Sequence, residues 1–549
     1  MSAEVEQQSE QHNAAALPTP AASSPSLAAG ISSALRKAFS FPALLGALLV
    51  GSVTLATRAS LPDPDMWWHL AAGKRILSTH TWPASDPFSF TVHGQYWIPY
   101  EWFGEVLMAW VERWAGLEGL AVLLALLSGV LALLVYYYAT LRSQNCKAAF
   151  IAAFFILNLA TGFFTVRPQM LGYIFLTLLL ICLEKYHQGH LNTLWILPVI
   201  FLIWVNSHAT FTLGLFALGI FWATGLVNVQ HGGLESRPWT QKQSCHLLLI
   251  LLACVAALAL TPYGTSLAAY PFWALISQPL NLAHVAEWRP IGFGEAWGMQ
   301  VLLLLLAFLL AQLIFRMNYR LYEVVLFLTA TYLACVHRRF FPSLAIIIVP
   351  LAALLLARWF PAYSAAKDHP VLNAVLIGAI ILTLVKLFPS RQDLDGLIQS
   401  VYPASALDYL QNHPQPGPMF NEYLWGGYMI WKLGPKQKVF IDGRTDIYEY
   451  AGVFADYLGM TSLDPKTLFM LRKYGIRSCL LTHDDPLGTL LSNSPGWRRV
   501  YKDNVCVIYS QQAGATQPNI TTRIETPAAS RVRFTAAVWK PALAEVTAR

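Results

Sequence analysis

Residues 117–141 read LEGLAVLLALLSGVLALLVYYYATL, an apolar run with a single acid near its start. As a helix, this run is long enough to cross the roughly 30 Å of hydrocarbon in a lipid bilayer. Similar runs occupy 301–315 and 371–387. Of the 549 residues, 56% are hydrophobic and only 12% are charged, whereas soluble domains carry about 25% charged residues. The sequence therefore predicts a polytopic α-helical membrane protein.

The apolar runs predict about 11 membrane spans with a cytoplasmic N-terminus. Arg36 and Lys37 precede the first span, and every connection expected on their side is basic, as the positive-inside rule requires. The net charge of +7 follows from such loops and needs no nucleic-acid partner. An odd number of spans puts the chain after residue 388 outside. The expected spans are 41–57, 117–141, 148–165, 168–184, 191–207, 209–229, 245–262, 297–315, 320–336, 340–357 and 370–388.

Composition divides the chain into four parts. Ala, Ser, Pro and Gln dominate the start, which is expected to be disordered. Mixed polarity and turn residues replace the apolar runs after the last span, which predicts a small extracytoplasmic α/β domain with strands at 438–441, 477–481 and 505–509. The predicted parts are a disordered cytoplasmic N-terminus (1–38), a transmembrane domain (39–388) with a first external loop (58–116), the α/β domain (389–511) and a flexible tail (512–549).

The first external loop begins with an unusual polar segment. Residues 62–70 read PDPDMWWHL. Taken locally, Asp63 and Asp65 are explained as caps of a helix over 66–79, because a carboxylate at a helix start accepts free backbone N–H groups. The paired tryptophans are explained equally well as interfacial anchors.

A functional reading of the same loop also stays open. Hard cations prefer several carboxylate oxygens, and a carboxylate can take a proton from an acceptor hydroxyl. Flat tryptophan faces suit the CH-rich side of a sugar ring. The residues concerned are Asp63, Asp65, Trp67, Trp68, His69, Asp86, Trp97 and Glu101.

Several cations lie on the side where the positive-inside rule expects few. Arg167 is in a very short external turn, where it is either an interfacial arginine with its head in water or a phosphate ligand. His337, Arg338 and Arg339 are wedged between two spans with almost no loop. A docking site for a lipid phosphate or diphosphate explains these three consecutive residues better than chance does.

The span interiors contain none of the charges that ion-coupled transport commonly needs. The acids and the lysine within the apolar runs fall near the ends of their spans. The sequence therefore disfavours a transporter and indicates chemistry at the outer surface.

Two motifs stand out in the C-terminal part. Residues 421–428 read NEYLWGGY, and residues 439–446 read VFIDGRTD. One reading is a structural strand and turn; the other is a platform that closes over the membrane site. Cys479 and Cys506 lie in strand-like segments, and their pairing is left open.

In the order and type of these motifs, the chain resembles the GT-C superfamily of membrane glycosyltransferases. The resemblance rests on the acids at 63 and 65, the Trp-Trp-His segment, Asp86 and the extracytoplasmic domain. Residues 424–428 with Asp442 are distantly similar to the Trp-Trp-Asp-Tyr-Gly motif of oligosaccharyltransferase catalytic subunits. Glycine replaces the acid of that motif, so recognition of an Asn-x-Ser/Thr peptide is not carried over. The chain also looks like unassigned bacterial membrane proteins with the signatures Asp-x-Trp-Trp-His-Leu and Asp-Gly-Arg.

The resemblance implies transfer of a sugar from a polyprenyl-phosphate-linked donor to a hydroxyl on a glycan, lipid or protein. It implies an envelope enzyme of the bacterial inner membrane, with the C-terminal domain periplasmic or extracellular. The alternatives are a non-catalytic membrane protein that binds lipid-linked glycan and, less favoured, a transporter. The expected catalytic residues are Asp65, Asp86 and Glu101; the donor phosphate ligands are Arg167, His337, Arg338 and Arg339; the substrate groove is Trp67, Trp68, His69, Trp97, Trp425 and Tyr428. No cofactor is certain, and a divalent metal, Mg²⁺ or Mn²⁺, is left open with Asp65, His69 and Asp86 as its candidate ligands.

Overall fold

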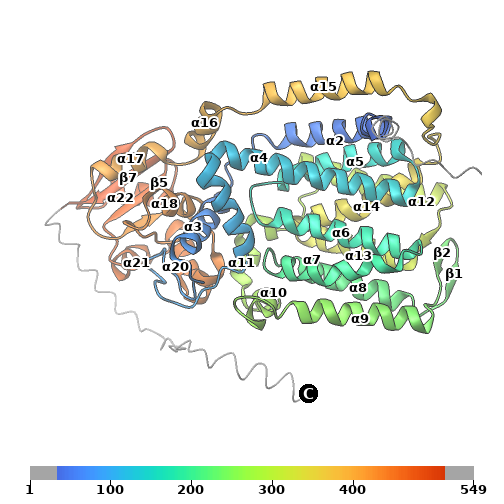
Figure 1. The fold of residues 1–549 in the computed structure, drawn as a ribbon. Helices are drawn as coiled ribbons and strands as arrows, with labels where there is room; N and C mark the ends of the chain where they lie inside the picture. The colour runs from blue at the N-terminus through green and yellow to red at the C-terminus, as the bar shows by residue number, and fades with distance from the viewer. Residues whose placement is uncertain (1–33, 513–549) are drawn as a thin grey trace, which may run out of the picture.

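The computed structural model describes residues 34–512. The predicted disordered N-terminus and flexible tail lie almost wholly outside this range, although residues 34–38 within it are helical. A bundle of apolar helices forms one part of the molecule, and the C-terminal domain packs against one end of the bundle (Figure 1). The polar cavity described below lies where these two parts meet.

Eleven apolar helices correspond to the eleven predicted spans. Within residues 34–512, six helical stretches are long and apolar enough to cross a membrane, and five more apolar helices are shorter. The count of eleven spans therefore stays a prediction, while the helical membrane architecture is clear. The helices are α2 (Phe41–Thr57), α4 (Trp102–Ser143), α5 (Cys146–Ala160), α6 (Gln169–His187), α7 (Leu197–Val205), α8 (Phe211–Thr224), α9 (Gln241–Ala257), α12 (Ala296–Ile314), α13 (Leu321–Val336), α14 (Phe341–Leu356) and α15 (Pro370–Leu387).

The long helix α4 is broken at Gly116, whose φ of 61° and ψ of −153° are not helical. Glycine adopts such angles readily because it has no Cβ. The break separates residues 102–115, which contain Glu105, Glu112 and Arg113, from the apolar run 117–141, where the sequence predicted a span. The first part of α4 thereby brings Glu101 and Glu105 toward the C-terminal domain.

Helix α3 (Pro64–Thr79) is the main element of the first loop. Asp63 caps it by accepting the N–H of Asp65, and Pro64 occupies the first turn, where its missing N–H costs nothing. The helix lies tightly against α4, because a Cβ at Gly73 would fall 2.0 Å from the backbone oxygen of Glu105. The helix-cap reading of Asp63 is therefore confirmed.

The C-terminal domain contains a four-stranded sheet in the order β4-β5-β7-β6, in which only the β4–β5 pair is parallel. The strands predicted at 477–481 and 505–509 are confirmed. The strand predicted at 438–441 is wrong: Val439 makes a single bridge to Ser89 of the first loop instead of joining the sheet. The strands are β4 (Met419–Asn421), β5 (Ser478–Thr482), β6 (Trp497–Lys502) and β7 (Cys506–Gln511).

Cys479 and Cys506 are both buried and free. In the β5–β7 ladder, Cys479 faces Tyr509 and Cys506 faces Thr482. This register places the two cysteines three rungs apart, about 10 Å along the strands. That separation exceeds what a disulfide can bridge.

The remaining elements frame the sheet and the loops. Helices of the C-terminal domain surround the sheet, while α10 and α11 lie in the loop segment before α12 (Figure 1). A second, small sheet with the order β1-β2-β3 lies at the opposite end of the bundle (Figure 1). The helices are α10 (Thr265–Ser277), α11 (Pro279–His284), α16 (Arg391–Val401), α17 (Ala404–Asn412), α18 (Gly426–Leu433), α19 (Thr445–Tyr450), α20 (Val453–Thr461), α21 (Thr467–Lys473) and α22 (Pro486–Ser492); the small sheet is β1 (Val229–His231), β2 (Leu234–Ser236) and β3 (Tyr319–Arg320).

Candidate functional site

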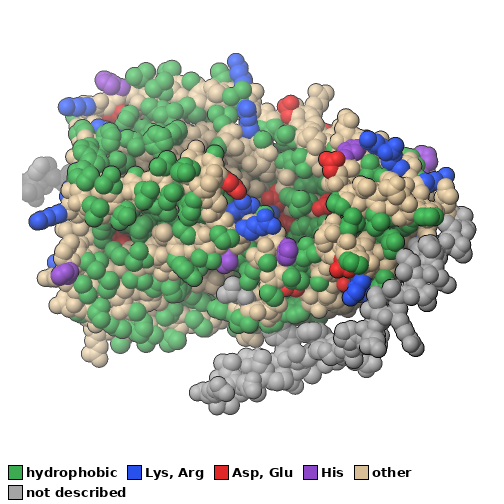
Figure 2. Space-filling model, turned by 180° about the vertical axis from the view of Figure 1, so that it is seen from behind, with side chains coloured by type: hydrophobic (Ala, Val, Ile, Leu, Met, Phe, Trp, Pro, Cys, Tyr) green, Lys and Arg blue, Asp and Glu red, His purple; other side chains and the backbone are tan. Residues whose placement is uncertain are grey.

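A polar cavity of about 100 Å³ lies at the junction of the bundle and the C-terminal domain. Acidic and basic side chains gather there, beside a bundle surface that is mostly hydrophobic (Figure 2). The walls come from α3, the start of α4, the turns before α6 and α8, the segment around α11, and the start of α19. Six of the predicted site residues line it, namely Asp65, Trp68, His69, Glu101, Arg167 and Arg339.

One wall is an ion cluster around Arg167. Its Nε lies 2.7 Å from Asp63 Oδ1, its Nη2 lies 2.9 Å from Asp65 Oδ2, and its Nη1 lies 2.7 Å from Glu287 Oε1. Glu287 belongs to the short 3₁₀ helix η3 (Ala286–Trp288). All three guanidinium nitrogens thus contact carboxylates, and these contacts use three of the five N–H donors of Arg167. The phosphate role of Arg167 stays a prediction.

Asp65 is held on its other side by Trp68 and the C-terminal domain. The indole Nε1 of Trp68 donates to Asp65 Oδ1 at 3.1 Å. Gly443 approaches so closely that a Cβ there would lie 2.0 Å from the same oxygen. Burial raises the pKa of Asp65 to about 6; the Arg167 charge counteracts this rise, while Asp63 and Glu287 add to it.

A second group of titratable side chains connects Glu101 with two histidines. Glu101 lies 3.5 Å from His69 Nε2 through one oxygen and 3.4 Å from His208 Nε2 through the other. His69 Nδ1 lies 3.1 Å from Glu105 Oε1. The other oxygen of Glu105 is buried and has no hydrogen-bond partner among residues 34–512.

Burial decides the charge states in this group. It raises the pKa of Glu101 to about 8, against the opposing charges of Arg339 and Arg167. Burial, assisted by the same two arginines, lowers the pKa of His208 to about 3, and burial also lowers the pKa of His69 well below its usual value. At neutral pH the cavity therefore contains a protonated Glu101 between two neutral imidazoles. His208 Nδ1 accepts the backbone N–H of Thr210, which leaves Nε2 as its protonated nitrogen.

Arg339 lines the cavity and forms no ion pair with an acidic side chain among residues 34–512. Its guanidinium lies 4.3 Å from the ring centroid of Trp288, a cation–π distance. Among the described residues, none forms a hydrogen bond or ion pair with its side chain. Arg339 lies in the 3₁₀ helix η4 (Arg338–Phe340), between the apolar helices α13 and α14.

The two neighbours of Arg339 in the predicted phosphate site do not line the cavity. The Nδ1 atom of His337 contacts the backbone oxygen of Trp288 at 2.6 Å, so this histidine fixes the tryptophan that lies against Arg339. The backbone N–H of Arg338 donates to the oxygen of Arg289 at 3.0 Å. Both residues thus hold the segment at Trp288 and Arg289 against η4.

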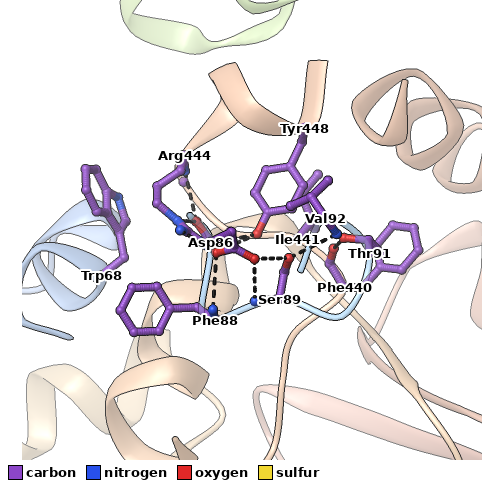
Figure 3. Close-up of polar contacts among 12 residues, drawn as sticks. Trp68, Asp86, Phe88, Ser89, Thr91, Val92, Phe440, Ile441, Arg444 and Tyr448 are labelled. Atoms are coloured by element: carbon purple, nitrogen blue, oxygen red, sulfur yellow. Dashed lines mark hydrogen bonds and ion pairs between the residues drawn. The ribbon is translucent and has the colours of Figure 1, made fainter. Parts of the chain in front are cut away.

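Asp86 does not line the cavity but belongs to a buried network (Figure 3) whose central residue, Arg444, does line it. Arg444 lies between Asp86 and Asp442, with 2.7 Å from its Nη1 to Asp86 Oδ1 and 2.7 Å from its Nη2 to Asp442 Oδ2. Tyr448 donates to Asp442, and Ser89 donates to Asp86 at 2.6 Å. Burial alone would raise the pKa of Asp86, but Arg444 and the Ser89 hydroxyl lower it.

This network, which we call the Asp86–Arg444 clasp, joins the first loop to the C-terminal domain. It includes Trp97, whose ring lies 4.7 Å from the Arg444 guanidinium. Asp86 and Trp97 therefore contact Arg444 in this network and do not themselves line the cavity. Arg444 belongs to the Asp-Gly-Arg signature, but no role was predicted for it, because its partner Asp86 lies 358 residues away in the sequence.

Most of the predicted groove aromatics are packing residues. Trp67 is fully buried, 4.8 Å from Tyr428 and 5.5 Å from Tyr402, at the contact of α3 with α18. Trp425 is also buried and donates to the backbone oxygen of Val401. Other aromatic rings line the cavity beside Trp68, and the sequence did not single all of them out. They are Tyr100, Tyr270, Trp288 and Tyr423.

The donors present do not fit a divalent metal ion at the predicted ligands. Asp86 is paired with Arg444, His69 lies against Glu105, and Asp65 faces the Arg167 guanidinium. Within residues 34–512, no group of three or more His, Cys, Asp or Glu side chains is arranged to hold such an ion.

The comparisons with known proteins give no match in sequence and a distant match in structure. No family model and no curated protein sequence matches it. Among solved structures, archaeal oligosaccharyltransferase AglB from Archaeoglobus fulgidus, in complex with an inhibitory peptide and a dolichol-phosphate, is similar at 13% sequence identity and a TM-score of 0.46. The match covers 86% of this chain and 75% of that one. A likeness at this level assigns no activity to any residue of this chain.

Proposed function

We propose that the protein is a membrane glycosyltransferase that moves a sugar from a polyprenyl-phosphate-linked donor to a hydroxyl acceptor. The observation that supports this proposal is Asp65, a partly buried carboxylate with a pKa of about 6 in a polar cavity at the end of an apolar bundle. A base works best when its pKa lies near the operating pH. With that pKa, most of the Asp65 population is deprotonated at neutral pH and able to accept a proton.

Asp65 would act as the general base. As the acceptor oxygen attacks the anomeric carbon, its proton passes to Asp65. The bond between that carbon and the phosphate oxygen breaks, and its electron pair leaves with the lipid phosphate. Trp68 and Arg167 hold the carboxylate in place during this step, because each contacts a different oxygen of Asp65.

Arg339 would bind the phosphate of the donor. Its guanidinium has no acid partner among the described residues, and an arginine can hold phosphate through two parallel N–H bonds. It would stabilise the negative charge that develops on the leaving phosphate. Its place between α13 and α14 would let the lipid tail lie along apolar helices while the phosphate reaches the cavity.

The aromatic lining suits a sugar. Tyr100 and Tyr270 stack at 4.2 Å between ring centroids, and Trp68 of α3 also lines the cavity. Such rings offer flat apolar faces, while the acids offer hydrogen-bond acceptors for hydroxyl groups. The topology expected from the sequence would place this cavity on the outer side of the membrane.

The test uses the full-length protein purified in detergent and two radiolabelled donors, polyprenyl-phosphate glucose and polyprenyl-phosphate mannose. Membrane extract supplies the acceptors, and transfer is measured as label released from the lipid fraction. We expect Asp65→Asn to lose transfer at least 100-fold while retaining donor binding, since the amide keeps the shape but accepts no proton. Asp395→Asn on α16, an exposed acid, is the matched control and keeps full transfer.

Unchanged transfer by Asp65→Asn would exclude Asp65 as the base. Donor binding by the wild-type protein without transfer to any acceptor would favour the alternative, a non-catalytic protein that binds lipid-linked glycan. Donor binding is measured by equilibrium filtration of the same labelled lipids.

A further inference from the structure

Arg167 makes contacts that resemble those of a bound cation. Its three guanidinium nitrogens contact three different carboxylates, from Asp63, Asp65 and Glu287, at 2.7, 2.9 and 2.7 Å. Only 12% of its side chain is exposed. A buried charge of this kind is stable only when partners compensate it. The three acids, in turn, have Arg167 as their shared counter-charge.

The three acids come from separate parts of the chain. Asp63 precedes α3, Asp65 lies in its first turn, and Glu287 lies in η3, 120 residues after Arg167. Arg167 therefore ties the first external loop to the segment before α12. A divalent ion with carboxylate ligands often performs this task in other proteins.

The geometry differs from that of a metal site. A divalent ion requires its oxygen ligands to converge on one point at about 2.0–2.6 Å. The guanidinium is flat and presents its donors around its rim, so the three carboxylates surround the plane instead of a point. With the guanidinium in place, each carboxylate contacts a different nitrogen, so the three oxygens share no common point. Removal of the guanidinium would free the three acids to converge on an ion.

The backbone keeps Arg167 in this position. Its N–H donates to the oxygen of Thr165 at 2.8 Å, and it is followed by Pro168, which restricts the preceding residue. Pro168 packs on α4, since a Cβ at Gly104 would lie 2.6 Å from its Cβ. The arginine thus projects from a turn that is fixed on both sides.

We propose that Arg167 is the built-in cation of this site and takes the place of a divalent metal ion. It offsets the charge of the acids and orients Asp65 without any ion from solution. This inference concerns cation binding by the folded chain, so it goes beyond the proposed function and stands whether or not sugar transfer is observed.

The test measures cation binding directly. Thermal unfolding of the purified protein is followed in detergent with EDTA and with increasing Mn²⁺, and bound Mn²⁺ is counted by electron paramagnetic resonance. We expect the wild-type Tm to be the same in both media, with no Mn²⁺ bound at the site. Arg167→Ala is expected to have a lower Tm in EDTA, and Mn²⁺ is expected to raise that Tm saturably with one ion bound per chain.

Arg142→Ala is the matched control. Arg142 is equally buried, with 12% of its side chain exposed, and it pairs with Glu323 at 2.6 Å. Its loss frees no set of three acids, so its Tm should not respond to Mn²⁺. Adding Asp65→Asn to Arg167→Ala should abolish the Mn²⁺ response.

Two results would overturn the inference. The first is binding of Mn²⁺ by the wild-type protein that is absent in Asp65→Asn, because this would show that a metal ion binds beside Arg167. The second is a folded Arg167→Ala that binds no Mn²⁺. If Arg167→Ala does not fold, Arg167→Gln is measured in its place. If neither variant folds, the comparison of Mn²⁺ binding by the wild-type protein and by Asp65→Asn decides the question alone.

Discussion

Replacing Gly443 with alanine is expected to disturb the cavity more than any other single methyl group. The added Cβ would lie 2.0 Å from Asp65 Oδ1 and 2.8 Å from Trp68 Nε1. Contacts below 3 Å do not occur for real Cβ atoms, so either α3 or the turn before α19 must move. Both the Trp68 hydrogen bond and the Arg167 ion pair of Asp65 would then lengthen.

The size of the effect follows from these contacts. Inserting a methyl group into a packed site typically costs about 1–3 kcal/mol of folding free energy. A displacement of about 1 Å at a reacting group can cost about 100-fold in rate. We therefore expect Gly443→Ala to remain folded, with a lower Tm, and to lose transfer by about 100-fold.

The assays are thermal unfolding in detergent and the initial rate of sugar transfer. Gly396→Ala in α16 is the control, because no atom lies within 4 Å of the Cβ it would add. Alanine favours a helix by about 1 kcal/mol over glycine, so this control should be as stable as the wild type or slightly more stable. A Gly443→Ala protein with wild-type Tm and rate would refute the close approach of the C-terminal domain to Asp65.

Three further predictions concern charges. Arg444→Met would leave Asp86 and Asp442 buried without their cation. Chemical unfolding should show that the free energy of unfolding falls by about 3–5 kcal/mol. A decrease below about 1 kcal/mol would contradict the stabilising role of the Asp86–Arg444 clasp. The pKa of Glu101 rises from 4.5 to about 8 on folding, so the folded state binds the extra proton and stability should fall as pH rises from 5 to 8. Glu101→Gln should flatten this pH dependence, and an unchanged slope would show that another group titrates. Arg339→Gln should weaken binding of labelled donor at least 10-fold without lowering Tm, because Arg339 pairs with no acid among residues 34–512; unchanged binding would remove it from the phosphate site.

The membrane helices were predictable because the signal is local. An apolar run long enough to span a bilayer identifies itself without knowledge of its neighbours, and each predicted span corresponds to an apolar helix. The start of the run at residue 117 was predictable for the same reason, and it coincides with the break at Gly116. Cavity residues such as Asp65 and His69 were found because they lie close together on one loop.

Roles that depend on distant partners were not predictable. Asp86 has the same acidic character as Asp65, but it pairs with Arg444, 358 residues away, and does not itself line the cavity. Trp67 and Trp68 are neighbours that face opposite environments, and only the packing of α3 against α18 decides which one reaches the cavity. The segment 438–441 has strand-like residues, yet its partner is the first loop, so it makes one bridge and no ladder.

The Asp86–Arg444 clasp has a consequence for biosynthesis. The first external loop leaves the ribosome early, whereas Arg444 is made only after every apolar helix has been synthesised. Asp65, His69 and Glu101 therefore wait for most of translation without the wall that completes their cavity. A chain that stalls before residue 444 would be inserted in the membrane without this wall, so the cavity is completed last, near the end of translation.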